Sequence, residues 1–587
     1  MPLLVPRYLN RANTRPVRME VYITSEYLGG SPILMADLIA ELAKLKRSEV
    51  IRCIVAISSQ LASPAGQHEQ LQWALATELL PPDALTALKR LAPTMEWAWT
   101  IFHRRQLSLL LQVAVGACRE ESGVQDSRTM AHAVGRMCLM ANTLLHAHEP
   151  VLDAEQWKRD YNFCFVPSII RVLDQTPRME ILARAYMLWF ELPNQPIIAR
   201  ELRRRHLPAF GPAFEKKHGL SLERFFLITV SLWSHYQSEA GGKAVATLVD
   251  ADQYLVPHFG RGDVCRAMQL LAQTPEMLAQ AVAGKPANSW IDDASPLMSR
   301  PLLEVFPGRY ACPDMAGLYR FLTERVYFLL KEAYPGNAFQ EVFGYVFEAY
   351  IATFVGEFGI ENDTFRNYWR SPKFVGSTAE ACDGLLSDGQ IALVMENKAR
   401  LLMHQEKYGG IPEITWRGAQ DIVGKPGTNK AGPKGVYQLA KSLARMLKGE
   451  TIHSGGANFT LTSTMKVIPA LVVYEDAVSL GAVRQWANAR LCSALEEHGV
   501  DPDRISQLLI LSIHDLERLE ALTHKTSWAK MIGEYADYAS THRDDPIANF
   551  DVFAFMHALP SEDPGTSLLA KLFDKAMTFA QESLPNP

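Results

Sequence analysis

The feature that most constrains the fold is an apolar strand that ends in charge. Residues 391–395, Ile-Ala-Leu-Val-Met, are followed directly by Glu396, Asn397 and Lys398. An uninterrupted apolar run of this length is typical of a strand covered on both faces, so we expect it to be central in a sheet. Charges at the end of a buried strand are costly unless they are paired or bind a metal ion. A structural Glu396–Lys398 ion pair is one interpretation, and a site of chemistry is the other.

A turn ahead of this strand brings in a second carboxylate. Asp388-Gly389 is typical of a two-residue type I′ turn, because both central residues of that turn need positive φ. Such a turn places Asp383 opposite Val394. Side chains alternate along a strand, so Val394, Glu396 and Lys398 share one face. Asp383 and Glu396 are then diagonal neighbours on that face, which favours a metal site over a lone ion pair.

The chain divides into two architectures. Its 587 residues are too many for a single core. Most of residues 67–300 shows apolar side chains at helical spacing, and a segment rich in Pro, Gly, Asn, Ser and Asp follows. We therefore expect a mostly helical N-terminal recognition or regulatory region over residues 1–300 and a connecting segment over 301–335.

The second half alternates helices with strands. The patterns predict a helix over 338–358, the hairpin, a long loop over 401–435, a helix over 436–448, a strand over 467–474, a helix over 483–498 and a strand over 507–513. This order predicts an α/β domain with a mixed central sheet over residues 336–515. A helical tail over 516–587 completes the predicted multidomain chain.

Composition narrows the class of protein. The net charge is −5, so the chain as a whole is not basic and any nucleic-acid surface must be local. The eight cysteines are scattered without a C-x-x-C pair, which excludes a zinc knuckle or a disulfide framework and suits a reducing compartment. No secretory signal or membrane-length apolar run is present. We expect a cytoplasmic protein with no membrane partner, and the oligomeric state stays open.

The order of these elements carries a resemblance. Glu348 lies in the predicted helix ahead of the hairpin, Asp383 opens one strand, and Glu396-x-Lys398 closes the next, before a helix and a strand. This resembles the PD-(D/E)xK nuclease superfamily, which has a restriction-endonuclease-like fold, over residues 336–515 only. Cys382 stands where the superfamily motif has its proline.

The resemblance implies roles for five residues. Glu348, Asp383 and Glu396 are the implied ligands of Mg²⁺, with Mn²⁺ as an alternative. Lys398 is implied to position water or to stabilise developing negative charge. Gln438, in the helix after the hairpin, is implied to add a polar catalytic group. Oxygen ligands and an adjacent ammonium suit phosphodiester hydrolysis on chemical grounds as well.

A locally basic stretch follows the hairpin. Ten Lys and Arg residues but only three acids lie between residues 398 and 448. We expect the cations of the Gly-rich loop and of the next helix to neutralise phosphates, which gives affinity for nucleic acid without sequence specificity. The alternative is an ordinary solvated surface loop. The predicted nucleic-acid-binding residues are Lys425, Lys430, Lys434, Lys441 and Arg445.

These observations predict a Mg²⁺-dependent nuclease that hydrolyses phosphodiester bonds, with DNA as the expected partner. A nuclease of RNA and a non-catalytic nucleic-acid-binding protein that keeps the fold are the alternatives. Helices ahead of a nuclease are similar in layout to bacterial restriction and anti-phage defence systems. The sequence leaves open endonuclease or exonuclease action, sequence or modification specificity, any trigger, and one or two metal ions.

Overall fold

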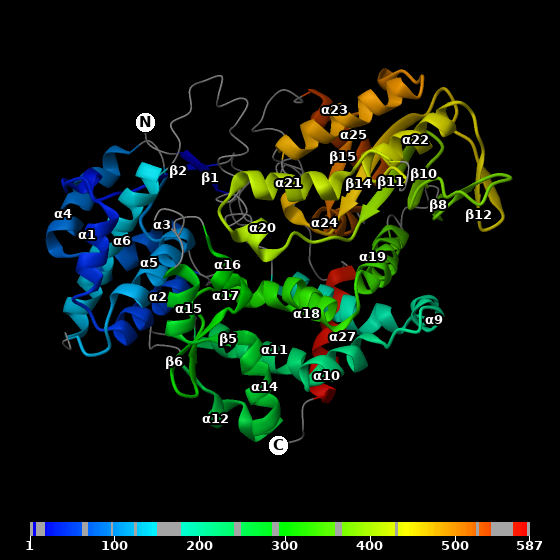
Figure 1. Ribbon diagram of the computed structural model, residues 1–587. Helices are drawn as coiled ribbons and strands as arrows, with labels where there is room; N and C mark the ends of the chain where they lie inside the picture. The colour runs from blue at the N-terminus through cyan, green and yellow to red at the C-terminus, as the bar shows by residue number, and fades with distance from the viewer. Residues whose placement is uncertain are drawn as a thin grey trace.

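Figure 1 shows the computed structural model, with a helical N-terminal half beside a C-terminal half built on a sheet. The structure describes residues 4–7, 18–61, 68–95, 98–122, 126–148, 178–239, 248–283, 293–357, 367–428, 432–479, 481–523, 527–541 and 568–583. The predicted helical region followed by an α/β region with a mixed sheet is confirmed at this coarse level.

The first group of helices packs around its own apolar cluster, which includes Leu38, Ile54 and Leu110. Three short strands, β1 (Leu4–Arg7), β2 (Arg18–Tyr22) and β3 (Ala98–Thr100), form a small sheet beside it. The helices are α1 (Met35–Leu42), α2 (Arg47–Leu61), α3 (His68–Leu79), α4 (Pro82–Leu91), α5 (Arg104–Ala117) and α6 (Ser127–His148).

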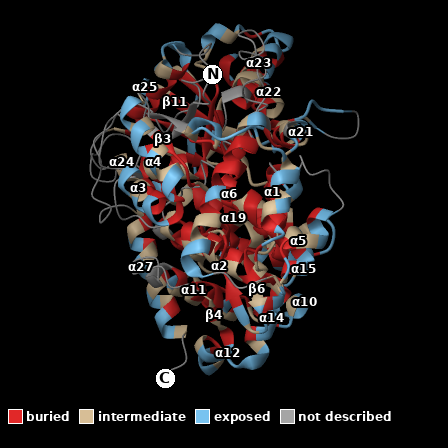
Figure 2. Cartoon of the chain, turned by 90° about the vertical axis from the view of Figure 1, so that its left-hand side faces the viewer, coloured by how far each residue is buried: buried red, intermediate tan, exposed pale blue. Residues whose placement is uncertain are grey.

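A second group of helices shares its core with the C-terminal half. Buried residues such as Phe225 and Leu329 belong to the same apolar cluster as Phe347 and Leu393. Figure 2 shows the buried residues running through the interior of the molecule. The helices are α8 (Arg178–Tyr186), α9 (Pro196–Arg204), α10 (Phe210–His218), α11 (Leu222–Glu239), α12 (Ala251–Tyr254), α13 (Val256–Phe259), α14 (Arg261–Leu271), α17 (Met315–Arg320) and α18 (Val326–Ala333). Helices α15 (Pro275–Ala283) and α16 (Ser295–Ser299) instead place Leu278 and Leu297 in the cluster of the first group.

A small sheet lies among these helices, in the strand order β4-β7-β6-β5. Its strands are β4 (Val249–Asp250), β5 (Ala272–Gln273), β6 (Leu302–Phe306) and β7 (Arg309–Ala311). The predicted boundary at residue 300 lies between α16 and β6, and the predicted boundary at residue 335 follows α18. The domain boundaries stay predictions.

The main sheet has five strands in the order β15-β14-β11-β10-β8. Strands β8 (Asn367–Arg370), β10 (Gly384–Ser387) and β11 (Ile391–Lys398) are antiparallel neighbours. Strands β14 (Lys466–Val473) and β15 (Leu509–Ser512) continue the sheet in parallel with β11. The central strand is β11, as its apolar sequence predicts, so the sheet is mixed.

Helices cover both faces of this sheet. Leu393 and Met395 face the cluster that contains α19 (Ala338–Glu357), whereas Val394 faces the cluster of α22 (Val436–Leu447) and α23 (Gly481–Glu497). Figure 1 shows α19 below the sheet and α22 and α23 above it. The end of β11 therefore emerges between two layers of helices, where Glu396 and Lys398 lie.

The predicted long loop over 401–435 is wrong. It contains two helices, α20 (His404–Tyr408) and α21 (Pro412–Val423). Ala419, Ile422 and Val423 of α21 are at most 2% exposed and pack into the cluster of α22. Charged and glycine-rich surroundings mask this short apolar face in the sequence, but burial of the face stabilises the helix.

The C-terminal helices α24 (Ile513–Thr523), α25 (Trp528–Thr541) and α27 (Leu568–Ser583) pack against the shared core. Strands β9 (Lys373–Phe374), β12 (Ile452–Ser454) and β13 (Ala457–Phe459) form a further small sheet. Within the described part of the chain, no helix has the length and apolar character needed to cross a membrane.

Candidate active site

The register of the β10–β11 hairpin differs from the predicted one. Ser387 pairs with Ala392 and Gly384 with Met395, so the turn is centred one residue later than predicted, at Gly389-Gln390. Oδ1 of Asp388 accepts hydrogen bonds from the N–H groups of Gln390 and Ile391 at 2.9 and 2.8 Å. Asp388 therefore caps the turn from its first position instead of occupying its centre.

The pairing of β10 with β11 ends at Gly384–Met395, next to both Asp383 and Glu396. The predicted placement of Asp383 opposite Val394 is wrong, because Val394 pairs with Leu385. The N–H of Asp383 donates to the carbonyl of Met395 at 3.1 Å, and Oδ2 of Asp383 accepts the N–H of Asn397 at 2.6 Å. Backbone hydrogen bonds thus hold the two acids together.

Lys398 is paired within the site. Its Nζ lies 2.7 Å from Oε1 of Glu396, whose residue is only 2% exposed. Burial raises the pKa of Glu396 to about 8, against the lowering effect of Lys398, and the nearby Asp383 raises it further. Burial also raises the pKa of Asp383, although the Asn397 N–H and Lys398 oppose the rise. The two acids Asp383 and Glu396 are therefore short of compensating positive charge.

Glu348 reaches the same end of the sheet from α19. Burial raises the pKa of Glu348 to about 7, the charge of Asp383 raises it further, and Arg370 lowers it. Lys398 also acts on Glu348, so four of the five residues implied by the resemblance are linked electrostatically through Asp383 and Lys398. The structure thus brings together Glu348, Asp383, Glu396 and Lys398 from α19, the start of β10 and the end of β11.

Two further charged residues belong to this cluster and were missed by sequence reasoning. The guanidinium of Arg370, at the end of β8, lies 4.0 Å from Glu348. Glu380 is exposed and raises the pKa of both Asp383 and Glu396. Arg370 enters the site because β8 pairs with β10, where Arg370 is opposite Gly384. No local pattern in the sequence indicates that pairing.

The other predicted residues lie at the periphery or outside the described ranges. Gln438 is half-buried on α22, and Lys434 and Lys441 are exposed. Lys425 is engaged by Asp421 at 2.8 Å. Arg445 is engaged by Glu450 at 2.6 Å and stacks on the ring of Phe374. Lys430 lies outside the described residues.

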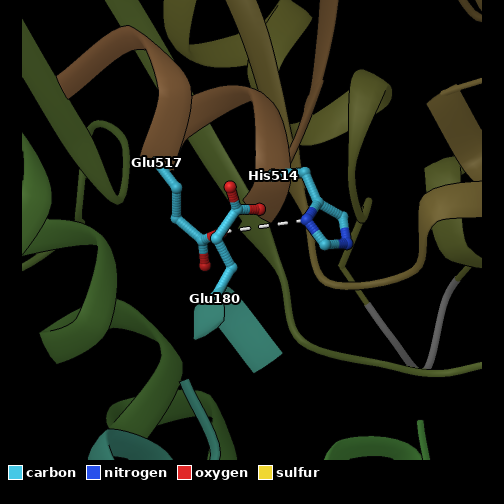
Figure 3. A group of neighbouring side chains, drawn as sticks. All are labelled: Glu180, His514 and Glu517. Carbon is cyan, nitrogen blue, oxygen red and sulfur yellow. Dashed lines mark ion pairs between the residues drawn. The ribbon is translucent and has the colours of Figure 1, made fainter. Parts of the chain in front are cut away.

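A different cluster has the most compact set of metal-type ligands. In the described ranges, one group of three such side chains has its ligand atoms within 4.8 Å of one another: Glu180, His514 and Glu517. Figure 3 shows these side chains turned toward one another. Arg184, however, donates to both carboxylate oxygens of Glu517 at 2.7 and 2.6 Å and lies 2.7 Å from Nδ1 of His514. A guanidinium already supplies the positive charge there, so this cluster is an internal ion pair.

That ion pair belongs to a larger buried network at the carboxyl ends of β14 and β15. Nζ of Lys407 lies 2.9 Å from Glu324 and 2.8 Å from Glu475, while Arg320 reaches Asp476 at 3.3 Å. A cavity of about 20 Å³, the size of one water, lies beside Glu324 and Asp476. Lys407 and Arg320 offset the burial of Glu324 and hold its pKa at about 2.

The two charged clusters differ in one respect. In the buried network, Lys407 and Arg320 lower the pKa of Glu324, although burial still raises that of Glu475. In the candidate site, burial and repulsion between carboxylates raise the pKa of Glu348, Asp383 and Glu396 alike. Asp383 and Glu396 each use one carboxylate oxygen in a hydrogen bond within the site, and among the described residues no donor engages the second oxygen. An all-oxygen donor set short of positive charge has the chemistry that a hard divalent cation such as Mg²⁺ prefers. The ligand atoms of the three acids do not all lie within 4.8 Å of one another.

No family model, curated protein or solved structure matches the chain.

Proposed function

We propose that this protein is a metal-dependent nuclease with its active site at the end of β11. The observation that carries the proposal is the contact between Asp383 and the end of β11: Oδ2 of Asp383 accepts the N–H of Asn397 at 2.6 Å, and Lys398 Nζ lies 2.7 Å from Glu396. A structural ion pair needs one acid, but this site gathers several buried acids around one lysine. Perturbed carboxylates gathered at one end of a sheet are typical of a functional site.

The topology supports a restriction-endonuclease-like fold. The chain runs from α19 through the antiparallel strands β8, β10 and β11 to α22 and then to β14, which is parallel to β11. This is the order on which the resemblance to the PD-(D/E)xK superfamily rests, and the acids and the lysine occupy its motif positions. Glu348 lies near Asp383 although α19 and β10 are far apart in sequence, and the resemblance requires that proximity.

The reaction assigned to the site is hydrolysis of a phosphodiester bond. The oxygen of a water molecule bonds to phosphorus as one ester P–O bond breaks. The proton lost by the water balances the proton gained by the leaving alkoxide oxygen. Glu348, Asp383 and Glu396 would hold Mg²⁺, or Mn²⁺ in its place. When bound, the ion supplies charge neutralisation for the phosphate.

The ammonium of Lys398 has a specific place in this scheme. It donates to Glu396, which holds it beside the carboxylates, and among the described residues no acceptor engages its other two protons. A fixed ammonium can orient the attacking water or stabilise the charge that develops on phosphate oxygens. A substitution of Lys398 that keeps the three carboxylates therefore tests catalysis separately from metal binding.

The test is cleavage of plasmid, linear duplex and single-stranded DNA and of RNA, with Mg²⁺ or with EDTA. Asp383→Ala, Glu396→Ala and Lys398→Ala are compared with the wild type, and their folding is checked by circular dichroism. We expect DNA cleavage that requires Mg²⁺ and is lost in all three variants. Cleavage that survives EDTA or all three substitutions contradicts the proposal. Cleavage of RNA alone, or binding without cleavage, selects one of the alternative functions.

We also propose a role in restriction or anti-phage defence, because a helical region precedes the site in the chain. Phage plating on cells with and without the intact gene tests this role. A plating efficiency that is unchanged by the gene contradicts it, and leaves the biochemical proposal standing.

A further inference from the structure

We infer that Arg370 binds the substrate phosphate that enters the site, as a contact residue in addition to those that the resemblance implies. This inference rests on the proposed nuclease function. It names a substrate-binding residue on β8, the strand next to the one that Asp383 precedes.

The backbone around Arg370 is fixed to the catalytic hairpin. Arg370 is the cross-strand partner of Gly384, and the N–H of Ser371 donates to the carbonyl of Asp383 at 2.9 Å. Ser371 has a positive φ of 44°, a conformation that costs energy for a residue other than glycine. The Oγ of Ser454 in β12 also donates to the carbonyl of Arg370 at 3.3 Å. Arg370 is thus held in register with Asp383.

The side chain, in contrast, is weakly engaged. Its guanidinium lies 4.0 Å from Glu348, beyond hydrogen-bond distance, and the side chain is 31% exposed. Across the described ranges, no oxygen accepts a hydrogen bond from this guanidinium. An arginine has five N–H donors in a planar fork that matches phosphate oxygens.

The charge balance of the site points to the same role. Four carboxylates (Glu348, Glu380, Asp383 and Glu396) and two cations (Lys398 and Arg370) leave a charge of −2 when all are ionised, so phosphate is repelled until a divalent cation is bound. Lys398 is already hydrogen-bonded to Glu396. Of the two cations in this cluster, Arg370 is therefore the one whose N–H donors can bind phosphate oxygens.

A purely structural role for Arg370 makes a different prediction. If it only screened Glu348, its removal would change the Mg²⁺ concentration needed for activity and leave nucleic-acid affinity unchanged. If it binds phosphate, its removal weakens nucleic-acid binding and reduces the salt dependence, because one fewer counterion is displaced.

The experiment measures fluorescence-anisotropy binding of a labelled 20-base-pair DNA duplex in Mg²⁺. Arg370→Met and Arg370→Lys are made in a Lys398→Met background so that the duplex stays intact. We expect Arg370→Met to weaken binding about tenfold or more and to reduce the slope of log affinity against log salt by about 0.9. Arg370→Lys should keep the slope and lose part of the affinity, because it retains the charge without the fork.

Arg309→Met is the matched control. Like Arg370, Arg309 lies on a strand and makes a long ion pair, 3.5 Å from Asp250, but both residues belong to the small sheet and not to the main sheet. Its affinity and slope should equal those of the Lys398→Met background. Unchanged affinity and slope in Arg370→Met, or a change confined to the Mg²⁺ requirement, overturns the inference. If the wild type neither binds nor cleaves nucleic acid, the proposed function fails first, which distinguishes the two failures.

Discussion

Removal of the buried Lys407 ammonium should destabilise the protein strongly. Lys407 is 2% exposed and lies between two buried carboxylates, 2.9 Å from Glu324 and 2.8 Å from Glu475. Lys407→Met keeps most of the side-chain volume but leaves both acids without this cation. Breaking a buried ion pair from one side costs about 3–5 kcal/mol of unfolding free energy.

The pKa of Glu324 gives a second measure of this cost. Burial favours the neutral acid, yet Lys407 and Arg320 hold the pKa at about 2, against an ordinary value of 4.5. That difference corresponds to about 3 kcal/mol of stability. Because the folded-state pKa is depressed, this stability is fully present above pH 4.5 and is lost as the pH falls through 2. The destabilisation by Lys407→Met should therefore be complete at pH 7.

Urea denaturation at pH 7, followed by tryptophan fluorescence, measures the effect. Lys44→Met is the control, because Lys44 is exposed and pairs with Glu41 at 2.5 Å, a surface pair whose loss costs about 0.5 kcal/mol. Adding Glu475→Gln to Lys407→Met should cost less than the sum of the two single changes, since one uncompensated charge is removed. A loss below about 1 kcal/mol in Lys407→Met refutes the account of the network.

Two further predictions concern the candidate active site. Gly384→Val should destabilise the hairpin by about 1–3 kcal/mol in urea denaturation, because a Cβ at residue 384 would lie 3.1 Å from Met395 and from Tyr368; an unchanged urea midpoint contradicts this. In EDTA, the unfolding free energy should fall by about 2 kcal/mol between pH 6.5 and 8. The folded-state pKa values of Glu348 and Glu396 are raised to about 7 and 8, so the stability that their protonation gives is lost as the pH rises through those values. Mg²⁺ should restore stability at pH 8, and an equal loss with and without Mg²⁺ contradicts the cation fit.

The sequence patterns predict the layers of the α/β half well. Helix α19 and strands β11, β14 and β15 lie within three residues of their predicted ranges, because their apolar runs are long and each has one dominant period. At the end of β11, Glu396 is buried and is paired with the half-buried Lys398, as the cost of burying an unpaired charge predicts.

Tertiary contacts account for what the sequence could not show. Asp388 caps its turn through its side chain, and the turn centre lies one residue later than predicted. Lys407 meets Glu324, which lies 83 residues earlier in the chain, and no local pattern encodes such a pair. Arg370 enters the site through pairing of β8 with β10, which is equally non-local. The domain boundaries, the metal and the nucleic-acid contacts stay predictions.

The initial rate of DNA cleavage in Mg²⁺ by Lys398→Met, relative to the wild type, tests the central claim most directly. Lys466→Met is the matched control, because Lys466 begins β14 in the same sheet and pairs with an acid, Asp537, at 2.6 Å. We predict a loss of about 10²-fold or more for Lys398→Met and a near wild-type rate for Lys466→Met. Equal rates for Lys398→Met and the wild type would contradict the assignment of the active site to the end of β11.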